Sequence, residues 1–327
     1  MSKKVFRTVM APFFPVLDIL LSPFTLLASV LLFCIRKIRV NKMPVSKGIF
    51  KMVGVFPITD HYYEPLFNDK HLKQPLNRDR SLPGINWNDQ EQLSLLDQFN
   101  FQVELDAIPF EKPENDLLFY YDNPSLGPAD AEYLYCMIRH FKPSRIIEIG
   151  SGYSTLMAKQ ALEKNISGEI TFKCEHICIE PYEMPWLEKT NVTVIRNLVE
   201  NVEMSLFKSL GRNDILFIDS SHMVRPQGDV LFEFLEILPS LNPGVIIHVH
   251  DIFSPRDYTH KHLVEDVLFW NEQYILEAFL SCNKQFKIIA ALNYLKNHYP
   301  NEMMSKLPLL RKYPSHEPGS FWMIKES

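Results

Sequence analysis

Hydrophobic and polar positions divide the chain into three regions with different patterns. From Thr8 to Ile35 the only charged residue is Asp18. Residues 44–127 are punctuated by proline and show no sustained period, apart from one short helix that we predict over 89–99 from its leucine spacing and an Asn/Asp cap. After residue 128, short apolar runs alternate with helical patterns. We therefore predict an apolar N-terminal segment at 1–43, an irregular N-terminal cap region at 44–127 and an α/β domain at 128–327.

The third region predicts a sheet that is covered by helices. Strands that alternate with helices form a parallel sheet with helices on both faces. A late apolar run at 320–324 adds an antiparallel edge strand, so the predicted fold class is α/β, with a Rossmann-like, seven-stranded, mostly parallel sheet. The other predicted strands are 145–149, 176–179, 192–195, 215–218, 245–249 and 286–290, and the predicted helices include 129–141, 154–164, 230–238 and 263–281.

The first region has the properties of a membrane anchor. A secretory signal peptide ends at small residues, whereas this apolar run ends in Phe33, Cys34 and Ile35. We therefore expect residues 1–43 to be retained and to bind the lipid bilayer. Basic residues flank the run on both sides: Lys3, Lys4 and Arg7 before it, and Arg36, Lys37, Arg39 and Lys42 after it.

Two topologies are compatible with this segment. Its length permits one crossing, since about 20 apolar residues span a bilayer, and the heavier basic flank after it would place the rest of the chain in the cytoplasm. Alternatively, Pro12, Pro15 and Pro23 favour a broken helix that enters and leaves through the cytoplasmic leaflet. Residues 17–32 resemble the re-entrant membrane helix of monotopic phosphoglycosyl transferases. Both topologies predict a protein of the cytoplasmic (inner) membrane whose catalytic domain is cytoplasmic.

Composition removes several classes of function. Hydrophobic residues make up 46% of the chain and charged residues 22%, which is typical of a folded protein. The net charge of -5 argues against a nucleic-acid partner. Five scattered cysteines without a CxxC pair argue against a disulfide scaffold or a zinc ribbon, and indicate free thiols in a reducing compartment. None of these features indicates the oligomeric state.

Polar residues follow four of the predicted strands, at the edge where open parallel sheets bind ligands. The first strand leads through Gly150 and Gly152 into a helix, an arrangement that brings backbone N–H groups close to an anionic ligand. Glu180 and Asp219 follow two further strands, and His250 with Asp251 follows another. Together with Glu148 near the end of the first strand, these residues place carboxylates at four neighbouring strand ends, which indicates a functional site.

These motifs resemble class I S-adenosylmethionine-dependent methyltransferases. The resemblance is to a branch that has an acidic-x-x-His motif at the fourth strand and Gly…His-Asp at the fifth, with bacterial, membrane-anchored relatives in glycan or lipid pathways. It covers the chain from about residue 128 onward, which makes 128–327 the predicted methyltransferase domain. The residues that carry it are EIGSGYST (148–155), IEPY (179–182), DSSHMVRPQGDV (219–230) and LNPGVIIHVHDI (241–252).

The resemblance implies a binding site for S-adenosylmethionine. Glu148 would orient the glycine loop, Glu180 would accept hydrogen bonds from the ribose hydroxyls, and Asn197 would lie near the adenine. A dinucleotide fingerprint has a third glycine where Thr155 stands, which favours the methyl donor over NAD. The implied cofactor-binding residues are Glu148, Gly150, Ser151, Gly152, Tyr153, Ser154, Glu180, Asn197 and Asp219.

Two mechanisms remain open for the chemical step. A histidine, His222 or His250, can remove the proton of the acceptor hydroxyl, with Asp251 beside it. Alternatively, Asp219 and Asp251 can hold a divalent metal that lowers the pKa of the hydroxyl. We favour the histidine base, because no spacing in the sequence demands a metal. His248, on the same strand face as His250, is interpreted as an interior histidine.

The predicted function is therefore O-methylation of a sugar or of a lipid-linked glycan at the cytoplasmic membrane face. One alternative is a nucleotide- or metal-dependent enzyme on the same fold. Another is a non-catalytic membrane scaffold, which the presence of Glu148, Glu180, Asp219, His222 and Asp251 argues against.

Overall fold

The computed structural model describes residues 11–326 and divides the chain into two compact units. The first unit ends at Leu72 and the second begins at Lys73, so the segment 44–127 contributes to both units. The predictions made for Lys3, Lys4 and Arg7 and for the beginning of the apolar run at Thr8 lie outside the described residues, as does Ser327.

The N-terminal unit is dominated by one apolar helix. An 18-residue stretch within Ala11–Ile38 has a mean hydropathy of 2.2, and the helical segment is long and apolar enough to cross a membrane. The α-helix α2 continues through Pro23 without a break. Of the two predicted geometries, the structure therefore has the continuous helix and not the broken one. The unit consists of η1 (Ala11–Phe13), α2 (Phe14–Ile38), η2 (Val40–Lys42), α3 (Pro44–Val53) and η3 (Asp69–His71).

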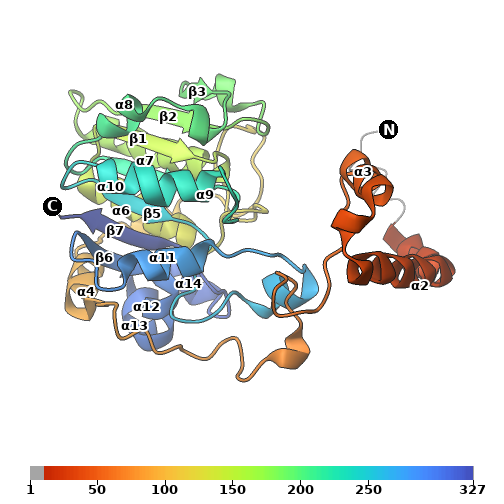
Figure 1. Ribbon diagram of the computed structural model, residues 1–327. Helices are drawn as coiled ribbons and strands as arrows, with labels where there is room; N and C mark the ends of the chain where they lie inside the picture. The colour runs from red at the N-terminus through yellow and green to blue at the C-terminus, as the bar shows by residue number, and fades with distance from the viewer. Residues whose placement is uncertain (1–10, 327) are drawn as a thin grey trace. The chain divides into compact units, whose positions relative to one another are not determined.

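The second unit contains a seven-stranded sheet, which confirms the predicted fold class (Figure 1). Its strand order is β3-β2-β1-β4-β5-β7-β6. The first five strands run parallel to one another, and the apolar runs of β1, β2, β4 and β5 are buried on both faces, as is typical of a parallel sheet. The strands are β1 (Arg145–Ile149), β2 (Glu175–Ile179), β3 (Thr193–Ile195), β4 (Ile215–Ile218), β5 (Ile246–Val249), β6 (Phe286–Ala291) and β7 (Phe321–Lys325).

The prediction that the last strand forms an edge is wrong. Strand β7 is antiparallel, as expected, but it lies between β5 and β6 and pairs with both. Trp322 of β7 is fully buried, in the core on the face of the sheet to which Ile146 and Phe217 point. The edge position belongs to β6 instead.

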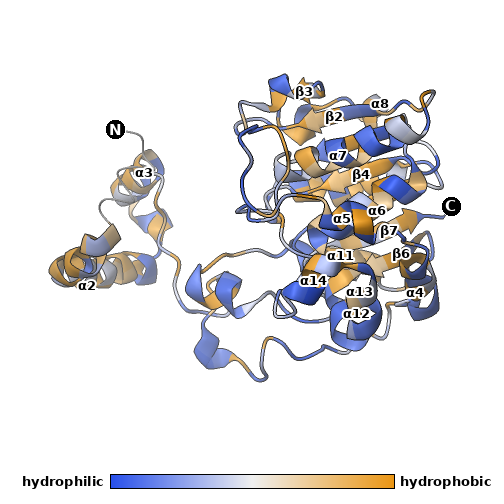
Figure 2. Cartoon of the chain, turned by 180° about the vertical axis from the view of Figure 1, so that it is seen from behind, coloured by the Kyte–Doolittle hydropathy of each residue, from blue (hydrophilic) through white to orange (hydrophobic). Residues whose placement is uncertain are grey.

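Helices cover both faces of the sheet because side chains alternate along each strand. Ile146 and Phe217 point to one face, and Ile147 and Leu216 to the other. The two views in Figures 1 and 2 show these layers from opposite sides. On the first face lie α4 (Asp89–Asp97), α5 (Gln102–Asp106), α6 (Asp130–Phe141), α7 (Tyr153–Gly168), α12 (Leu292–His298), α13 (Pro300–Lys306) and α14 (Pro308–Lys312). On the second lie α8 (Met204–Lys208), α9 (Asp229–Phe232), η6 (Glu233–Ile237), α10 (Leu238–Ser240) and α11 (Glu272–Leu280).

Two helix predictions need correction. The helix predicted over 263–281 is interrupted: one turn, η7 (Lys261–Glu265), is followed by an irregular segment before α11 begins. No continuous helix runs into α11, because the N–H groups of Asn271 and Glu272 donate to the carbonyl of His222 and not to carbonyls of a preceding helical turn. Helix α4 forms as predicted, but Asn88 has a left-handed backbone and makes no capping hydrogen bond with its side chain.

Candidate functional site

Backbone pairing brings the ends of the parallel strands together at one edge. Ile149 of β1 is paired with Ile179 of β2 and with Ile218 of β4, and Ile218 is paired with Val249 of β5. The hydrogen bonds continue one residue further: Asp219 N–H donates to the Ile149 carbonyl at 2.8 Å. The residues that follow the strands therefore start from neighbouring, fixed positions.

Gly150 turns the chain sharply at the end of β1. Its φ is +76°, in the left-handed region that favours glycine. A Cβ atom at this position would lie 1.8 Å from the carbonyl oxygen of Asp219. The loop after β1 can therefore run directly against the end of β4 only because residue 150 has no side chain.

A buried hydrogen-bond network holds this loop from below. The Thr155 hydroxyl donates to Glu148 at 2.5 Å and accepts from the Gly152 N–H at 3.2 Å. His176 lies 3.0 Å from the other Glu148 oxygen. Burial lowers the pKa of His176, but the Glu148 carboxylate outweighs it and raises that pKa to about 10. Glu148 thus acts on the loop through Thr155 and does not line the cavities above it.

His176 was not predicted as a site residue. In the sequence it lies within Cys174-Glu-His-Ile-Cys178, which reads as ordinary strand structure. His176 lies in β2 two residues before Cys178, which is the register partner of Glu148, and the distance between the two side chains identifies His176 as the partner of that carboxylate.

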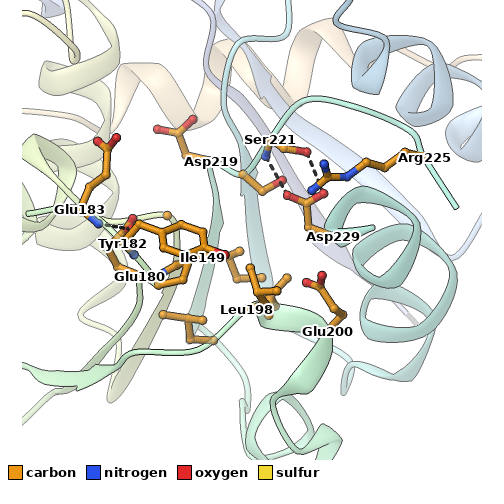
Figure 3. Close-up of a pocket in the computed structure, with 15 residues that line it drawn as sticks. Ile149, Glu180, Tyr182, Glu183, Leu198, Glu200, Asp219, Ser221, Arg225 and Asp229 are labelled. Atoms are coloured by element: carbon orange, nitrogen blue, oxygen red, sulfur yellow. Dashed lines mark hydrogen bonds between the residues drawn. The ribbon is translucent and has the colours of Figure 1, made fainter. Parts of the chain in front are cut away.

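Two adjoining cavities lie above the strand ends, and both are lined by Gly150, Glu180, Glu183 and Asp219. The larger has a volume of about 390 Å³. Figure 3 shows the segment of Glu180 and Tyr182 on one side of it and Asp229 with Arg225 on the other. The smaller, of about 210 Å³, is lined further by the loop residues Ser151, Gly152, Tyr153 and Ser154.

Glu180 connects the two halves of this space. One of its carboxylate oxygens accepts from the N–H groups of Tyr182 and Glu183, and the other accepts from Ser151 N–H at 3.4 Å. These bonds fix the carboxylate at the wall of both cavities. Asn197 lines neither cavity; the residues after it, 198–200, line the larger one.

Two carboxylates and two histidines converge beside the cavities. His222 Nε2 lies 3.3 Å from Asp219 Oδ1 and 3.6 Å from Asp251 Oδ2. His250 Nδ1 lies 3.5 Å from Asp251 Oδ1 and 3.9 Å from Asp219 Oδ1. The two aspartates are partly exposed and the two histidines are buried behind them, so the carboxylates form the surface of the cluster.

Glu272 completes this cluster from α11. It is fully buried and its Oε2 lies 2.8 Å from His222 Nδ1. Trp270, in the irregular segment before α11, lies over His222 with ring centroids 4.4 Å apart. Glu272 is a polar exception in the apolar helix predicted over 263–281. Neither the contact of Glu272 with His222 nor that of Trp270 was predicted, because the apolar spacing predicts one continuous core helix.

Backbone strain accompanies the cluster. His222 and Asp251 have φ values of +58° and +55°, which side-chain-bearing residues rarely adopt. Such conformations persist where surrounding contacts impose them, and they concentrate at functional sites. Here the Gly319 backbone presses against Asp251: a Cβ on Gly319 would lie 3.0 Å from Asp251 Cα.

The charges of the cluster shift its ionisation strongly. Burial lowers the pKa of His222, but Asp219 and Glu272 raise it well above its ordinary value. Burial likewise opposes protonation of His250, but Asp219 and Asp251 raise its pKa to about 10. Burial raises the pKa of Asp251, and His250 and His222 outweigh that effect and lower it. Without a further positive charge, both histidines are therefore protonated at neutral pH.

His248 stays outside this chemistry. It is stacked on Phe217 with ring centroids 4.1 Å apart, and its Nε2 is 3.0 Å from the Ser320 hydroxyl. Burial and the neighbouring His250 lower its pKa well below the ordinary value, so it is a neutral interior histidine.

Comparisons with known proteins agree with this architecture. Residues 147–252 match the family model of a methyltransferase domain. A protein of Archaeoglobus fulgidus whose function is uncharacterized is 32% identical over 184 residues, which cover 52% of this chain and 80% of that protein.

Solved structures of methyltransferases show a looser likeness. An O-methyltransferase from Bacillus cereus in complex with SAH has a TM-score of 0.37 and 13% identity, covering 72% of this chain and 91% of its own. The MycE methyltransferase with Mg and SAH has a TM-score of 0.34 and 14% identity, covering 62% and 51%. Because both TM-scores are low, these structures carry no argument about the family of this chain, and the family model and the archaeal relative are the comparisons that do.

Proposed function

This chain belongs to the same family as the Archaeoglobus fulgidus protein and contains a methyltransferase domain, and we propose that it is an S-adenosylmethionine-dependent O-methyltransferase. The observation that carries the proposal is the position of the cluster of Asp219, His222, His250 and Asp251 directly beside the two cavities. Asp219 belongs to both: it lines the cavities and contacts the two histidines.

The two cavities suit the two ends of the methyl donor. The smaller one, at the loop of Gly150 and Gly152 and the beginning of α7, would take the methionine part. The larger one would take the adenosine, with the Glu180 carboxylate facing the ribose hydroxyls. NAD is disfavoured because Thr155 stands at the third glycine position and is tied to Glu148.

The donor set of the cluster fits a divalent cation. One ligand atom each from Asp219, His222 and Asp251 lie within 4.8 Å of one another. Glu272 accepts the Nδ1 proton of neutral His222 and leaves its Nε2 lone pair facing the two aspartates. Carboxylate and imidazole ligands together suit cations such as Mg²⁺ or Mn²⁺.

In the chemical step, the acceptor oxygen forms a bond to the methyl carbon while the bond from that carbon to sulfur breaks. The acceptor proton passes to His250, whose two ring nitrogens are buried and have no hydrogen-bond partner among the described residues. When bound, a divalent cation would neutralise the two aspartates, so that the pKa of His250 falls toward neutrality, and would lower the pKa of the acceptor hydroxyl. Asp219, His222 and Asp251 orient the acceptor against the methyl group.

The acceptor is proposed to be a hydroxyl of a sugar or of a lipid-linked glycan at the cytoplasmic face of the inner membrane. This proposal is supported by α2, an apolar helix without a buried residue in the same chain as the methyltransferase domain. An anchor of this kind would raise the frequency of encounters with an acceptor that lies in the membrane, because the enzyme and the acceptor would then diffuse in the same plane.

Calorimetry tests the choice of cofactor. We expect the purified chain to bind S-adenosylmethionine and S-adenosylhomocysteine and not NAD, because Glu180 and the Thr155-bound loop fit the former. The Glu180→Ala variant, which lacks the carboxylate, should bind both S-adenosylmethionine and S-adenosylhomocysteine more weakly. Tight binding of NAD, or unchanged affinity of the variant, would contradict the proposal.

Fractionation tests the anchor. Deletion of residues 1–43 removes α2 and should move the protein from the membrane pellet to the supernatant, since α2 is the one helix within residues 11–326 that is long and apolar enough to span a bilayer. Quantitative immunoblotting of both fractions gives the readout, with the intact chain as control. A truncated protein that still sediments with membranes would show that another segment is the main anchor.

A further inference from the structure

Helix α3 has an exposed apolar face that nothing in its own unit covers. Val45, Ile49, Met52 and Val53 follow the spacing of one helix face, and their exposed fractions are 75%, 49%, 80% and 63%. Exposure of this kind on four residues of a single ten-residue helix is unusual for a surface that only meets water.

The opposite face of α3 is basic, and so are the residues that flank α3 in the sequence. Lys47 and Lys51 lie one turn apart on that face. Between residues 36 and 59 there is no acidic residue, while six positions are basic: Arg36, Lys37, Arg39, Lys42, Lys47 and Lys51. A basic, amphipathic helix is typical of a segment that lies in the plane of a membrane surface.

Contacts within the N-terminal unit fix the orientation of α3. Phe50, on the side away from the apolar face, meets Phe56 edge to face with ring centroids 5.9 Å apart. The Arg36 guanidinium, at the end of α2, lies 5.3 Å from the Phe56 ring and pairs with Glu64. Gly54, with φ of +77°, ends the helix and returns the chain. Phe50 is therefore used for internal packing, and the four apolar residues are not.

We propose that α3 lies in the headgroup region of an anionic lipid bilayer, with its apolar face in the acyl boundary and its lysines at the phosphates. The occupant of the exposed face is thus the lipid surface itself. The inference rests on the proposed membrane attachment of α2, from which α3 is separated only by the short turn η2. Charge complementarity selects anionic lipid, because each basic residue near such a surface adds attraction.

Site-directed labelling of the full chain tests this. In a background with the exposed Cys34 and Cys282 replaced by serine, an environment-sensitive fluorophore is placed at M52C or, as matched control, at K47C. Each protein is reconstituted in phosphatidylcholine vesicles with and without phosphatidylglycerol. Quenching by acrylamide in the water and by brominated lipid in the bilayer is then measured.

We expect the label at position 52 to be protected from acrylamide and quenched by brominated lipid when phosphatidylglycerol is present. The label at position 47 should show the reverse. Adding Lys51→Gln to M52C should lessen the protection in phosphatidylglycerol vesicles and change nothing in pure phosphatidylcholine, because it removes a charge and leaves the apolar face intact.

Three results would overturn the inference: equal acrylamide access at positions 47 and 52, protection that does not depend on phosphatidylglycerol, or shielding of position 52 from both quenchers, which indicates a protein partner. A separate variant that keeps Cys34 and has only Cys282 replaced by serine carries the label on α2 and reports on that helix independently. Lipid quenching at position 34 with an open position 52 would refute the role of α3 and leave the anchor standing.

Discussion

Asp251→Asn is expected to lower the rate of methyl transfer by about a thousandfold while leaving methyl-donor affinity nearly unchanged. Asp251 contacts both His222 and His250, whereas it lines neither of the two cavities. The substitution keeps the shape of the side chain and removes a charge that acts on the acceptor proton. Single-turnover transfer from radiolabelled S-adenosylmethionine to a membrane lipid extract measures the rate, and calorimetry measures the affinity.

A matched control and a chelator sharpen this result. Asp97→Asn makes the same chemical change at an exposed position in α4 and should leave the rate unchanged. Chelation of divalent cations should inactivate the wild-type protein and added Mg²⁺ should restore it. Loss of activity in Asp251→Asn together with indifference to chelator would favour the histidine cluster alone. Full activity of the variant would contradict the site assignment.

Gly150→Ala is expected to weaken binding of S-adenosylmethionine by about 100-fold or more, equivalent to roughly 2.7 kcal/mol. A left-handed backbone costs an alanine about 1 kcal/mol, and its Cβ would meet the Asp219 carbonyl at 1.8 Å, so the loop must shift away from β4. The shift displaces the loop residues Ser151 and Gly152, which line the smaller cavity. Calorimetry gives the affinity. The thermal unfolding temperature shows whether the substitution disturbs only the loop or destabilises the whole domain.

Gly168→Ala is the control for this substitution, because a Cβ at the end of α7 has no atom within 4 Å. It should leave both affinity and unfolding temperature unchanged. Wild-type affinity in Gly150→Ala would rule out the loop as the binding site for the methyl donor.

The strand ends were predictable from sequence because a buried parallel strand is a short apolar run with a clear end. The runs at 145–149 and 215–218 coincide with β1 and β4, and the polar residues after them meet because parallel strands end at one edge. The position of β7 was not predictable. An apolar run has the same pattern at an edge and in the middle of a sheet, and only its distant partners in β5 and β6 decide between the two.

The contacts of the buried residues behind the site were not predictable for a similar reason. Glu272 and His176 are charged residues within apolar segments, and their partners His222 and Glu148 are distant in the sequence. Period alone cannot show that α11 begins only at Glu272, since the carbonyl of His222 takes the N–H groups that would have continued a helix.

The placement of β7 also has a consequence for the order in which the protein matures on the ribosome. Synthesis proceeds from the N-terminus, so β5 and β6 are made before β7. Strands β5 and β6 emerge next to a vacant position that only β7, translated later, can fill. Until then, Ile246–Val249 presents an unpaired edge to solvent. A nascent chain stalled before β7 should therefore depend on chaperones more than the completed chain does.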